Sequence, residues 1–294
     1  MLPTLQARSY CKINWTLDVL FKREDGYHEL RTIYQTVSLH DVLHISETAG
    51  PIEIVCEDPR VPSDETNLAF KAAALLREAT ATSKGARIEI EKHIPVAAGL
   101  GGGSSNAAVT LLALVKLWKL DVETQELASV AARLGSDVPF FLIGGTALGV
   151  GRGEDVLAIE QAHADHLLLV NPGFPVSTRD SYEKLSRLTR LEAASIMPFT
   201  LPAAKGIREL TLAARNDLEE VVIAAHPEIA EVKRRLLDLG ARHALMSGSG
   251  ATVFGVFDNS EVAERAQSEV RSTGYWAERV RTVDGQEYEA TTFK

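Results

Sequence analysis

Cysteine is scarce and long apolar runs are missing, and each absence excludes a class of protein. Only two cysteines, Cys11 and Cys56, occur among 294 residues, and neither belongs to a CxxC pair. A disulfide framework or a structural zinc site is therefore not expected, and a reducing, cytoplasmic compartment fits best. No apolar run reaches the roughly 18 residues that cross a bilayer, and the N-terminus lacks the pattern of a signal peptide.

The chain also has fewer basic than acidic residues. The chain carries 31 lysines and arginines against 40 aspartates and glutamates, which gives a formal net charge of −9. Nucleic acids and anionic membranes bind surfaces that have a positive field. Neither is expected as a partner, although a local basic pocket could still bind a small anion.

The length of 294 residues suits two domains, since a domain has about 100–200 residues. We place the boundary near residue 156, which gives domains over residues 1–156 and 157–294. Strand-like and helix-like segments alternate through both halves, and this pattern predicts a two-layer α+β fold. Whether the protein is a monomer or a homodimer is not predicted by these features.

The strand signals of the first half are alternating ones. Residues 12–20 and 87–92 alternate apolar with polar side chains, which predicts strands with one wet face in an antiparallel or mixed sheet. Asp25 and Gly26 predict a turn after the first of these strands. The Gly-rich stretch over 139–157 is strand-like, and its second half resembles an exposed link.

Helix signals are present in both halves. In the first half we expect helices over residues 64–80, 104–118 and 123–135, with Asp64 or Thr66 as the cap of the first. In the second half we expect helices over 179–190, 204–213, 217–239 (with Asn216 as a cap and a new start at Pro227) and 260–274, capped by Ser260. Strands are expected over 166–172, on both sides of a Gly turn within 241–258, and over 275–283.

The stretch "GLGGGSSNAA", Gly99 to Ala108, places four glycines directly before a helix signal. Glycine lets the backbone approach a ligand closely, and a helix N-terminus offers free amides and a partial positive charge. Together they predict a phosphate-binding site. Ser104 and Ser105 add hydroxyl donors, and Ser105 or Asn106 could also reach a metal ion or a sugar.

Two common nucleotide-binding patterns do not fit this loop. A Walker A motif requires a lysine directly after the glycines, and the next lysine here is Lys116. A dinucleotide motif requires a third spaced glycine where Ser104 stands, although Asp121 follows Gly101 at the distance of a ribose-binding acid. A nucleotide-binding oxidoreductase and a non-catalytic binding module remain as alternatives.

Several motifs, in matching order, resemble those of the GHMP small-molecule kinases. "PVAAGLGGGSSNAA" is similar to the phosphate-binding signature of this family, "GSDVPFF" to its catalytic-aspartate segment and "LMSGSGATVFGVF" to its third motif. "ARSYCKINWTLDVLFKREDGYHEL" resembles the N-terminal segment of the branch that phosphorylates a cytidine diphosphate ester. The resemblance implies a two-domain α+β fold, with a ribosomal S5 domain 2-like first domain and a ferredoxin-like second domain. It also implies transfer of a phosphoryl group from ATP to an alcohol.

The resemblance implies that Lys12 and Asp137 form a catalytic pair. Asp137 would orient or deprotonate the substrate hydroxyl, while Lys12 would keep this carboxylate ionised and stabilise the transferring phosphoryl group. The local sequence alone favours other interpretations, namely a helix-cap aspartate and a solvated lysine on the polar side of a strand.

Five residues are implied at the acceptor substrate. His28 offers one donor and one acceptor to the cytosine edge, and Tyr27 and Tyr182 would stack on its ring. Asn14 and the region of Thr178 would contact the hydroxyls and the diphosphate. Without the resemblance, Tyr27 and His28 are typical of ordinary hairpin residues.

The resemblance also implies the residues around ATP. Asn67 and Lys92 would lie near the adenosine, and the serines of the glycine loop near the phosphates or Mg²⁺. The implied ATP-binding residues are Asn67, Lys92, Pro95, Gly99, Leu100, Gly101, Gly102, Gly103, Ser104, Ser105, Asn106, Gly248, Ser249 and Gly250. Mg²⁺ should neutralise much of the phosphate charge, but the sequence assigns no residue as its ligand.

Overall fold

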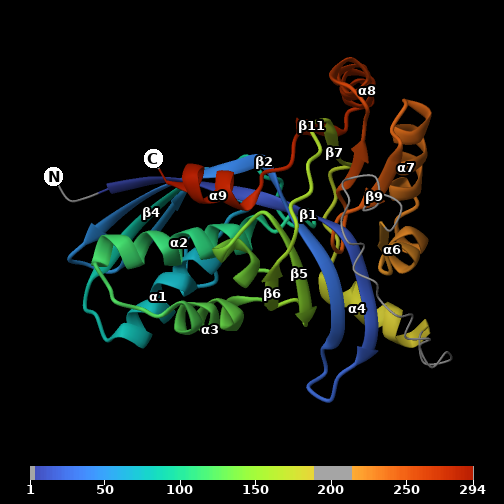
Figure 1. The fold of residues 1–294 in the computed structure, drawn as a ribbon. Helices are drawn as coiled ribbons and strands as arrows, with labels where there is room; N and C mark the ends of the chain where they lie inside the picture. Colours follow the sequence, from blue (N-terminus) through green and yellow to red (C-terminus); the bar gives the residue numbers. More distant parts are fainter. Residues whose placement is uncertain (1–3, 189–213, 294) are drawn as a thin grey trace.

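The computed structural model describes residues 4–188 and 214–293 of the chain. Figure 1 shows two sheets, each with its own helices, that meet along the strand β1 (Thr4–Lys22). The helix expected over 204–213 and the end of the one expected over 179–190 lie outside the described residues.

The first sheet is built around two long strands. β1 and β2 (His28–Thr48) pair antiparallel, and the turn between them falls where the sequence predicts it. The sheet has the order β3-β4-β2-β1-β8, with β5 paired to β2 and β6 paired to β5. Its other strands are β3 (Ile52–Cys56), β4 (Gly85–Glu91), β5 (Thr146–Gly151), β6 (Asp155–Ala158) and β8 (Arg215–Asn216). Because β4 runs antiparallel to β2 and parallel to β3, the expectation of an antiparallel or mixed sheet is confirmed.

Three helices cover one face of this sheet (Figure 1): α1 (Leu68–Thr80), α2 (Gly102–Trp118) and α3 (Thr124–Leu134). Aliphatic side chains such as Leu76 and Leu111 pack with Ile45 and Ile88 of the sheet in one buried cluster. Burial of each such side chain stabilises the fold by about 1.5–3 kcal/mol. A short 3₁₀ helix, η1 (Pro139–Leu142), follows α3 and leads into β5.

The second sheet consists of four antiparallel strands in the order β11-β7-β10-β9. Its strands are β7 (Leu167–Asn171), β9 (His243–Met246), β10 (Val253–Val256) and β11 (Trp276–Val280). The helices of this half are α4 (Thr178–Leu188), α6 (Glu219–Ala225), α7 (Glu228–Asp238), α8 (Ser260–Ser272) and α9 (Gly285–Thr292). The break before α7 falls at Pro227, as expected from proline at a helix start. The last helix, α9, returns to β1 of the first sheet.

Four local predictions are wrong. α2 begins at Gly102 and not at Ser104, because Gly101 takes a left-handed φ of +69° and already ends the loop. The side chains that cap α1 and α8 belong to Asn67 and Asn259, each one residue beside an expected cap. Asn216 does accept a bond from the amide of Leu218 at 3.0 Å, but Leu218 occupies the N-cap position of α6.

The second half of 139–157 is not an exposed link. It forms the hairpin β5–β6, and β5 pairs with β2 in the first sheet. The expected domain boundary at residue 156 therefore falls inside β6.

The polar face of β1 is the largest departure from the alternation argument. Residues 12–18 are buried on both faces, and Lys12, Asn14, Thr16 and Asp18 are each at most 3 % exposed. A strand that is covered on its polar side must satisfy those groups internally, which makes this face a candidate site.

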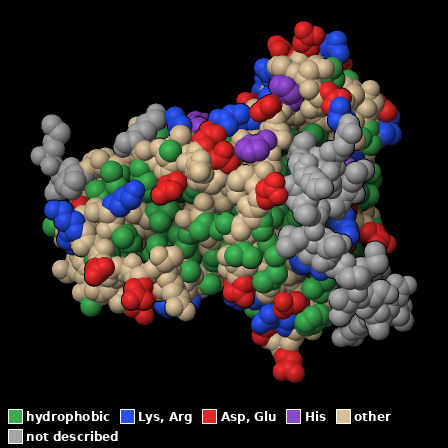
Figure 2. Space-filling model, viewed as in Figure 1, with side chains coloured by type: hydrophobic (Ala, Val, Ile, Leu, Met, Phe, Trp, Pro, Cys, Tyr) green, Lys and Arg blue, Asp and Glu red, His purple; other side chains and the backbone are tan. Residues whose placement is uncertain are grey.

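Acidic and basic side chains are interspersed over the face shown in Figure 2. In the described part of the chain, every helix is too short or too polar to cross a membrane.

Candidate active site

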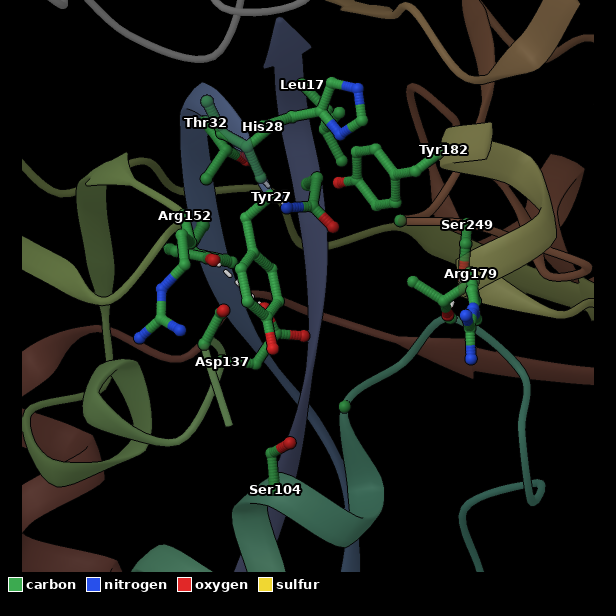
Figure 3. A pocket seen from close by; sticks show the side chains of 18 of the residues that line it. Leu17, Tyr27, His28, Thr32, Ser104, Asp137, Arg152, Arg179, Tyr182 and Ser249 are labelled. Atoms are coloured by element: carbon green, nitrogen blue, oxygen red, sulfur yellow. Dashed lines mark hydrogen bonds between the residues drawn. The ribbon is translucent and has the colours of Figure 1, made fainter. Parts of the chain in front are cut away.

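A cavity of about 760 Å³ lies against the polar face of β1. Its walls come from the β1–β2 hairpin, the start of α2, the segment before η1, the glycine turn after β9 and the start of α4. In Figure 3, His28 and Tyr182 lie at one end of the cavity and Ser104 on α2 at the other, with Tyr27 and Asp137 between them. Of the residues that the sequence singled out, Lys12, Asn14, Tyr27, His28, Asp137, Thr178 and Tyr182 all line this cavity.

Lys12 and Asp137 lie together at the centre of the cavity. Their Nζ and Oδ2 atoms are 3.4 Å apart, and the Lys12 ammonium also donates to Oδ1 of Asn14 at 2.6 Å. Lys12 is only 3 % exposed, so the interpretation as a solvated lysine is wrong. Asp137 precedes η1, where the cap position belongs to Val138 and no side-chain oxygen caps the helix. The helix-cap interpretation of Asp137 is therefore wrong as well.

Tyr34 is a residue of this centre that sequence reasoning missed. Its hydroxyl donates to Oδ1 of Asp137 at 3.0 Å, and its ring stacks on Phe140 at 4.8 Å between centroids. Burial and the charge of Asp137 hold the pKa of Tyr34 well above its usual range, so the hydroxyl remains a donor at neutral pH. No sequence motif marks Tyr34; the strand pairing brings it to the site, because Tyr34 lies opposite Asn14 across the ladder of β1 and β2.

The far end of the cavity is aromatic. The rings of His28 and Tyr182 stack at 5.4 Å between centroids with an interplanar angle of 23°. Burial and the positive charge of Lys22 lower the pKa of His28 below its usual value, so its imidazole is neutral at neutral pH. Tyr27 stands at the hairpin tip with 55 % of its surface exposed. A neutral imidazole beside an aromatic ring can bind the edge of a flat heterocycle while the ring contacts its face.

The glycine loop reaches the centre of the cavity through Gly101. A Cβ at this position would lie 2.9 Å from the ring of Phe141 and 3.1 Å from Cγ of Lys12, so the close approach requires glycine. The amide of Lys12 donates to the carbonyl of Leu100 at 3.0 Å, which fixes the loop to β1. No side chain caps the N-terminus of α2, so its amides are open to an anion.

The second glycine turn, over 248–250, packs on this loop. The hydroxyl of Ser247 donates to the carbonyl of Gly99 at 3.0 Å, and Gly248 lies beside the ammonium of Lys12. The hydroxyls of Ser249 and Thr178 are 2.7 Å apart. Gly250 lines neither cavity and serves the contact between the two turns.

A second cavity of about 330 Å³ lies on the other side of the glycine loop. It is lined by Asn67, Lys92, Pro95, Leu100, Gly102, Gly103 and Asn106, and it shares Gly99, Gly101 and Ser104 with the first cavity. Residues that the sequence did not assign to ATP binding complete the wall, namely Arg60, Val61, Pro62, Thr66, Leu68, Val96, Ala97 and Ala98.

Several residues of this second wall are also held by structural contacts. Asn67 caps α1, and the ammonium of Lys92 is 2.6 Å from the fully buried carboxylate of Asp41. Ser105 lines neither cavity, because its hydroxyl accepts from Ser9 at 2.7 Å in the interior. Among the residues that the structure describes, no three His, Cys, Asp or Glu side chains gather as a metal cage.

Comparison with known proteins defines the class. The models of the GHMP kinase N-terminal and C-terminal domains match residues 67–145 and 203–275. A homoserine kinase from Cytophaga hutchinsonii shares the fold, with a TM-score of 0.71 and 16 % identity over 97 % of this chain and 96 % of that one. The chain belongs to the GHMP kinases, so its fold class is confirmed, and the oxidoreductase and binding-module alternatives are wrong.

The relatives narrow the family further. The 4-diphosphocytidyl-2-C-methyl-D-erythritol kinase of Syntrophus aciditrophicus is 43 % identical over 93 % of this chain and 97 % of its own. That of Geobacter sulfurreducens is 42 % identical over 96 % of this chain and its full length. A crystal structure of a 4-(cytidine 5'-diphospho)-2C-methyl-D-erythritol kinase gives a TM-score of 0.77 at 35 % identity, over 94 % of this chain and 98 % of that one. Within the GHMP kinases, the chain belongs to the 4-diphosphocytidyl-2-C-methyl-D-erythritol kinase family.

Proposed function

We propose that the protein transfers the γ-phosphoryl group of ATP to the 2-hydroxyl of 4-diphosphocytidyl-2-C-methyl-D-erythritol. This reaction belongs to the non-mevalonate route to isoprenoid precursors. The observation that carries the proposal is the pair of cavities that meet at one glycine loop. A donor in the smaller cavity and an acceptor in the larger one would contact the same residues, Gly101 and Ser104, from opposite sides.

The catalytic step takes place where the cavities meet. Phosphoryl transfer requires a positioned nucleophile and neutralised charge, with little covalent chemistry from the protein. Asp137 orients the substrate hydroxyl and accepts its proton, while Tyr34 holds the other carboxylate oxygen. The ammonium of Lys12 lies 3.4 Å from Asp137 and stabilises charge on the transferring group.

The larger cavity suits the cytidine diphosphate ester. His28 donates to and accepts from the cytosine edge, and Tyr27 and Tyr182 contact the faces of the ring. Asn14 and Thr178 line the stretch between this aromatic end and Asp137, where the substrate hydroxyls and the diphosphate would lie.

The smaller cavity would hold ATP, with adenosine near Asn67 and Lys92 and phosphates at the start of α2. Mg²⁺ binds through one or two carboxylates and the phosphates of its substrate. The hydroxyl of Ser104, which lines both cavities, could add a ligand to an ion that the nucleotide carries, and such an ion would neutralise charge on the phosphates. The division at residue 156, the choice between monomer and homodimer, and a cytoplasmic location stay predictions.

A coupled assay of ADP release tests the proposal. We expect ATP-dependent turnover with 4-diphosphocytidyl-2-C-methyl-D-erythritol and none with homoserine or mevalonate. Turnover of either of the other acceptors, with none of the cytidine ester, would contradict the proposed substrate. Stabilisation by ATP without any ADP release would contradict catalysis.

A further inference from the structure

The hairpin β5–β6 contributes a residue to the acceptor cavity that the family motifs do not account for. Its turn, Arg152 to Glu154, follows β5, and Arg152 lines the cavity beside Tyr27. The guanidinium carbon of Arg152 lies 4.9 Å from the centroid of the Tyr27 ring. This geometry is a cation–π contact between two segments more than a hundred residues apart in sequence.

Tyr27 has a fixed backbone and an exposed ring. Its amide donates to the carboxylate of Asp25 at 3.0 Å, and its carbonyl accepts from the amide of Arg23 at 2.8 Å. The side chain extends from this fixed backbone with 55 % of the residue exposed. A ring that must be immobilised when a ligand binds costs part of the binding free energy, and a ring already held in place does not.

Arg152 is itself held rigidly. The carboxylate of Glu154 accepts from the backbone amide of Arg152 at 2.6 Å and from its Nε at 2.8 Å. The side chain of Arg152 is only 27 % exposed, which is low for an arginine at the tip of a turn. A single carboxylate thus fixes both ends of the side chain, and the flat guanidinium is left facing the tyrosine ring.

The same turn is tied to the catalytic centre. The hydroxyl of Tyr34 lies 3.3 Å from the carbonyl of Gly153, next to its bond to Asp137. A side chain at Gly153 would overlap that hydroxyl, and the left-handed φ of +107° also favours glycine there. The position of Arg152 is therefore set by the folded core and not by a mobile loop.

We propose that Arg152 is a positioning residue for substrate binding: it holds the Tyr27 ring as a preformed stacking surface for the pyrimidine base. Figure 3 shows Arg152 and Tyr182 on opposite sides of Tyr27, so the guanidinium occupies one side of the ring and leaves the cavity side to the base. The proposal rests on the proposed function, because it assigns Tyr27 to the cytosine. Stacking uses the face of a base, whereas His28 reads its edge, so Arg152 contributes affinity without discriminating between pyrimidines.

The test compares Arg152→Ala with wild type by calorimetric titration of cytidine 5'-diphosphate and by steady-state kinetics. At an exposed site, loss of a cation–π contact should raise the Kd of this ligand, and the KM of the cytidine ester, about two- to five-fold. The kcat and the KM of ATP should not change. Arg152→Lys should bind the ligand more tightly than Arg152→Ala and less tightly than wild type, because lysine keeps the positive charge but lacks the planar guanidinium group.

A double-mutant cycle with Tyr27→Leu separates this role from a direct contact with the ligand. In the Tyr27→Leu background, Arg152→Ala should have no further effect on the Kd. The ratio of the Kd values for cytidine and uridine diphosphates should be the same with and without Arg152. The matched control is Arg87→Ala on β4, since Arg87 makes the same 2.8 Å bond from Nε to a glutamate two residues on, Glu89, away from both cavities.

Two results would overturn the proposal. An unchanged Kd in Arg152→Ala would show that Tyr27 needs no such support. An equal loss of affinity in the wild-type and Tyr27→Leu backgrounds would show that Arg152 acts by another contact. Failure of the proposed function has a different signature, because the wild-type enzyme would then not turn over the cytidine ester at all.

Discussion

Removal of one hydroxyl group tests whether the catalytic carboxylate must be held in a fixed orientation. The Tyr34 hydroxyl donates to Oδ1 of Asp137 at 3.0 Å, while Lys12 faces Oδ2 at 3.4 Å. Tyr34→Phe removes the first contact and keeps the second. The ring should stay in place, because it is 2 % exposed and stacked on Phe140.

The size of the effect follows from the charge of the acceptor. A hydrogen bond to a charged group contributes about 1.5–3 kcal/mol, and each 1.36 kcal/mol changes a rate roughly tenfold. If that whole contribution is needed to orient Asp137 in the transition state, kcat should fall roughly 10- to 100-fold. The KM of ATP should remain within about two-fold, because Tyr34 does not line the smaller cavity.

The assay is steady-state ADP release, with thermal unfolding of each variant as the check on folding. Tyr10→Phe is the matched control, since Tyr10 is also buried and its hydroxyl is paired with Thr291 at 2.7 Å, outside both cavities. That variant should keep the wild-type kcat. A folded Tyr34→Phe enzyme with kcat within about two-fold of wild type would refute the reasoning, and Lys12 alone would then suffice to orient Asp137.

Two further predictions concern the centre and the aromatic end of the acceptor cavity. Asp137→Ala should lower kcat by at least about 100-fold while stabilisation of the fold by ATP persists; near-normal turnover would exclude Asp137 as the group that receives the proton. Burial and the charge of Lys22 lower the pKa of His28, so the neutral ring should bind cytidine 5'-diphosphate with constant affinity at and above neutral pH. Affinity should be lost on acidification, as pH falls through that lowered pKa, and His28→Gln should remove this dependence in calorimetric titrations. If the affinity of the wild-type protein fell as the pH was raised above neutral, neutral His28 would not be the group that binds the cytosine edge.

The glycine loop could be predicted from the sequence because its chemistry is local. Four glycines before a helix specify an anion site from neighbouring residues alone, and the structure places Gly99 to Gly103 along one cavity wall. The predicted helix start and the predicted role of Ser105 were less accurate. The helix α2 starts at Gly102, and the Ser105 side chain points into the interior. Both differences arise from contacts with distant segments, namely Phe141 against Gly101 and Ser9 against Ser105.

The acceptor side could not be predicted from local pattern. Polar residues that alternate with apolar ones along a strand normally face water. The alternation in β1 therefore predicts a solvated Lys12. The glycine loop, the segment that carries Asp137 and the turn at Gly248 cover this face of β1, so Lys12 becomes a buried group beside Asp137. Only the resemblance to a family suggested that pairing. Tyr34 and Arg152 belong to no motif, and only the folded chain brings them to the site.

The two cavities impose different constraints on the chain. The loop must bring backbone amides to a phosphate, and at Gly101 no side chain fits between Phe141 and Lys12, so this part tolerates little change. The acceptor end is built from the tip of the β1–β2 hairpin, the start of α4 and the β5–β6 turn, which are all at the ends of elements. Changes there alter the shape of the larger cavity without moving β1 or α2, the elements that hold Lys12 and the loop. The choice of acceptor can therefore change within this fold while the site of phosphoryl transfer stays the same.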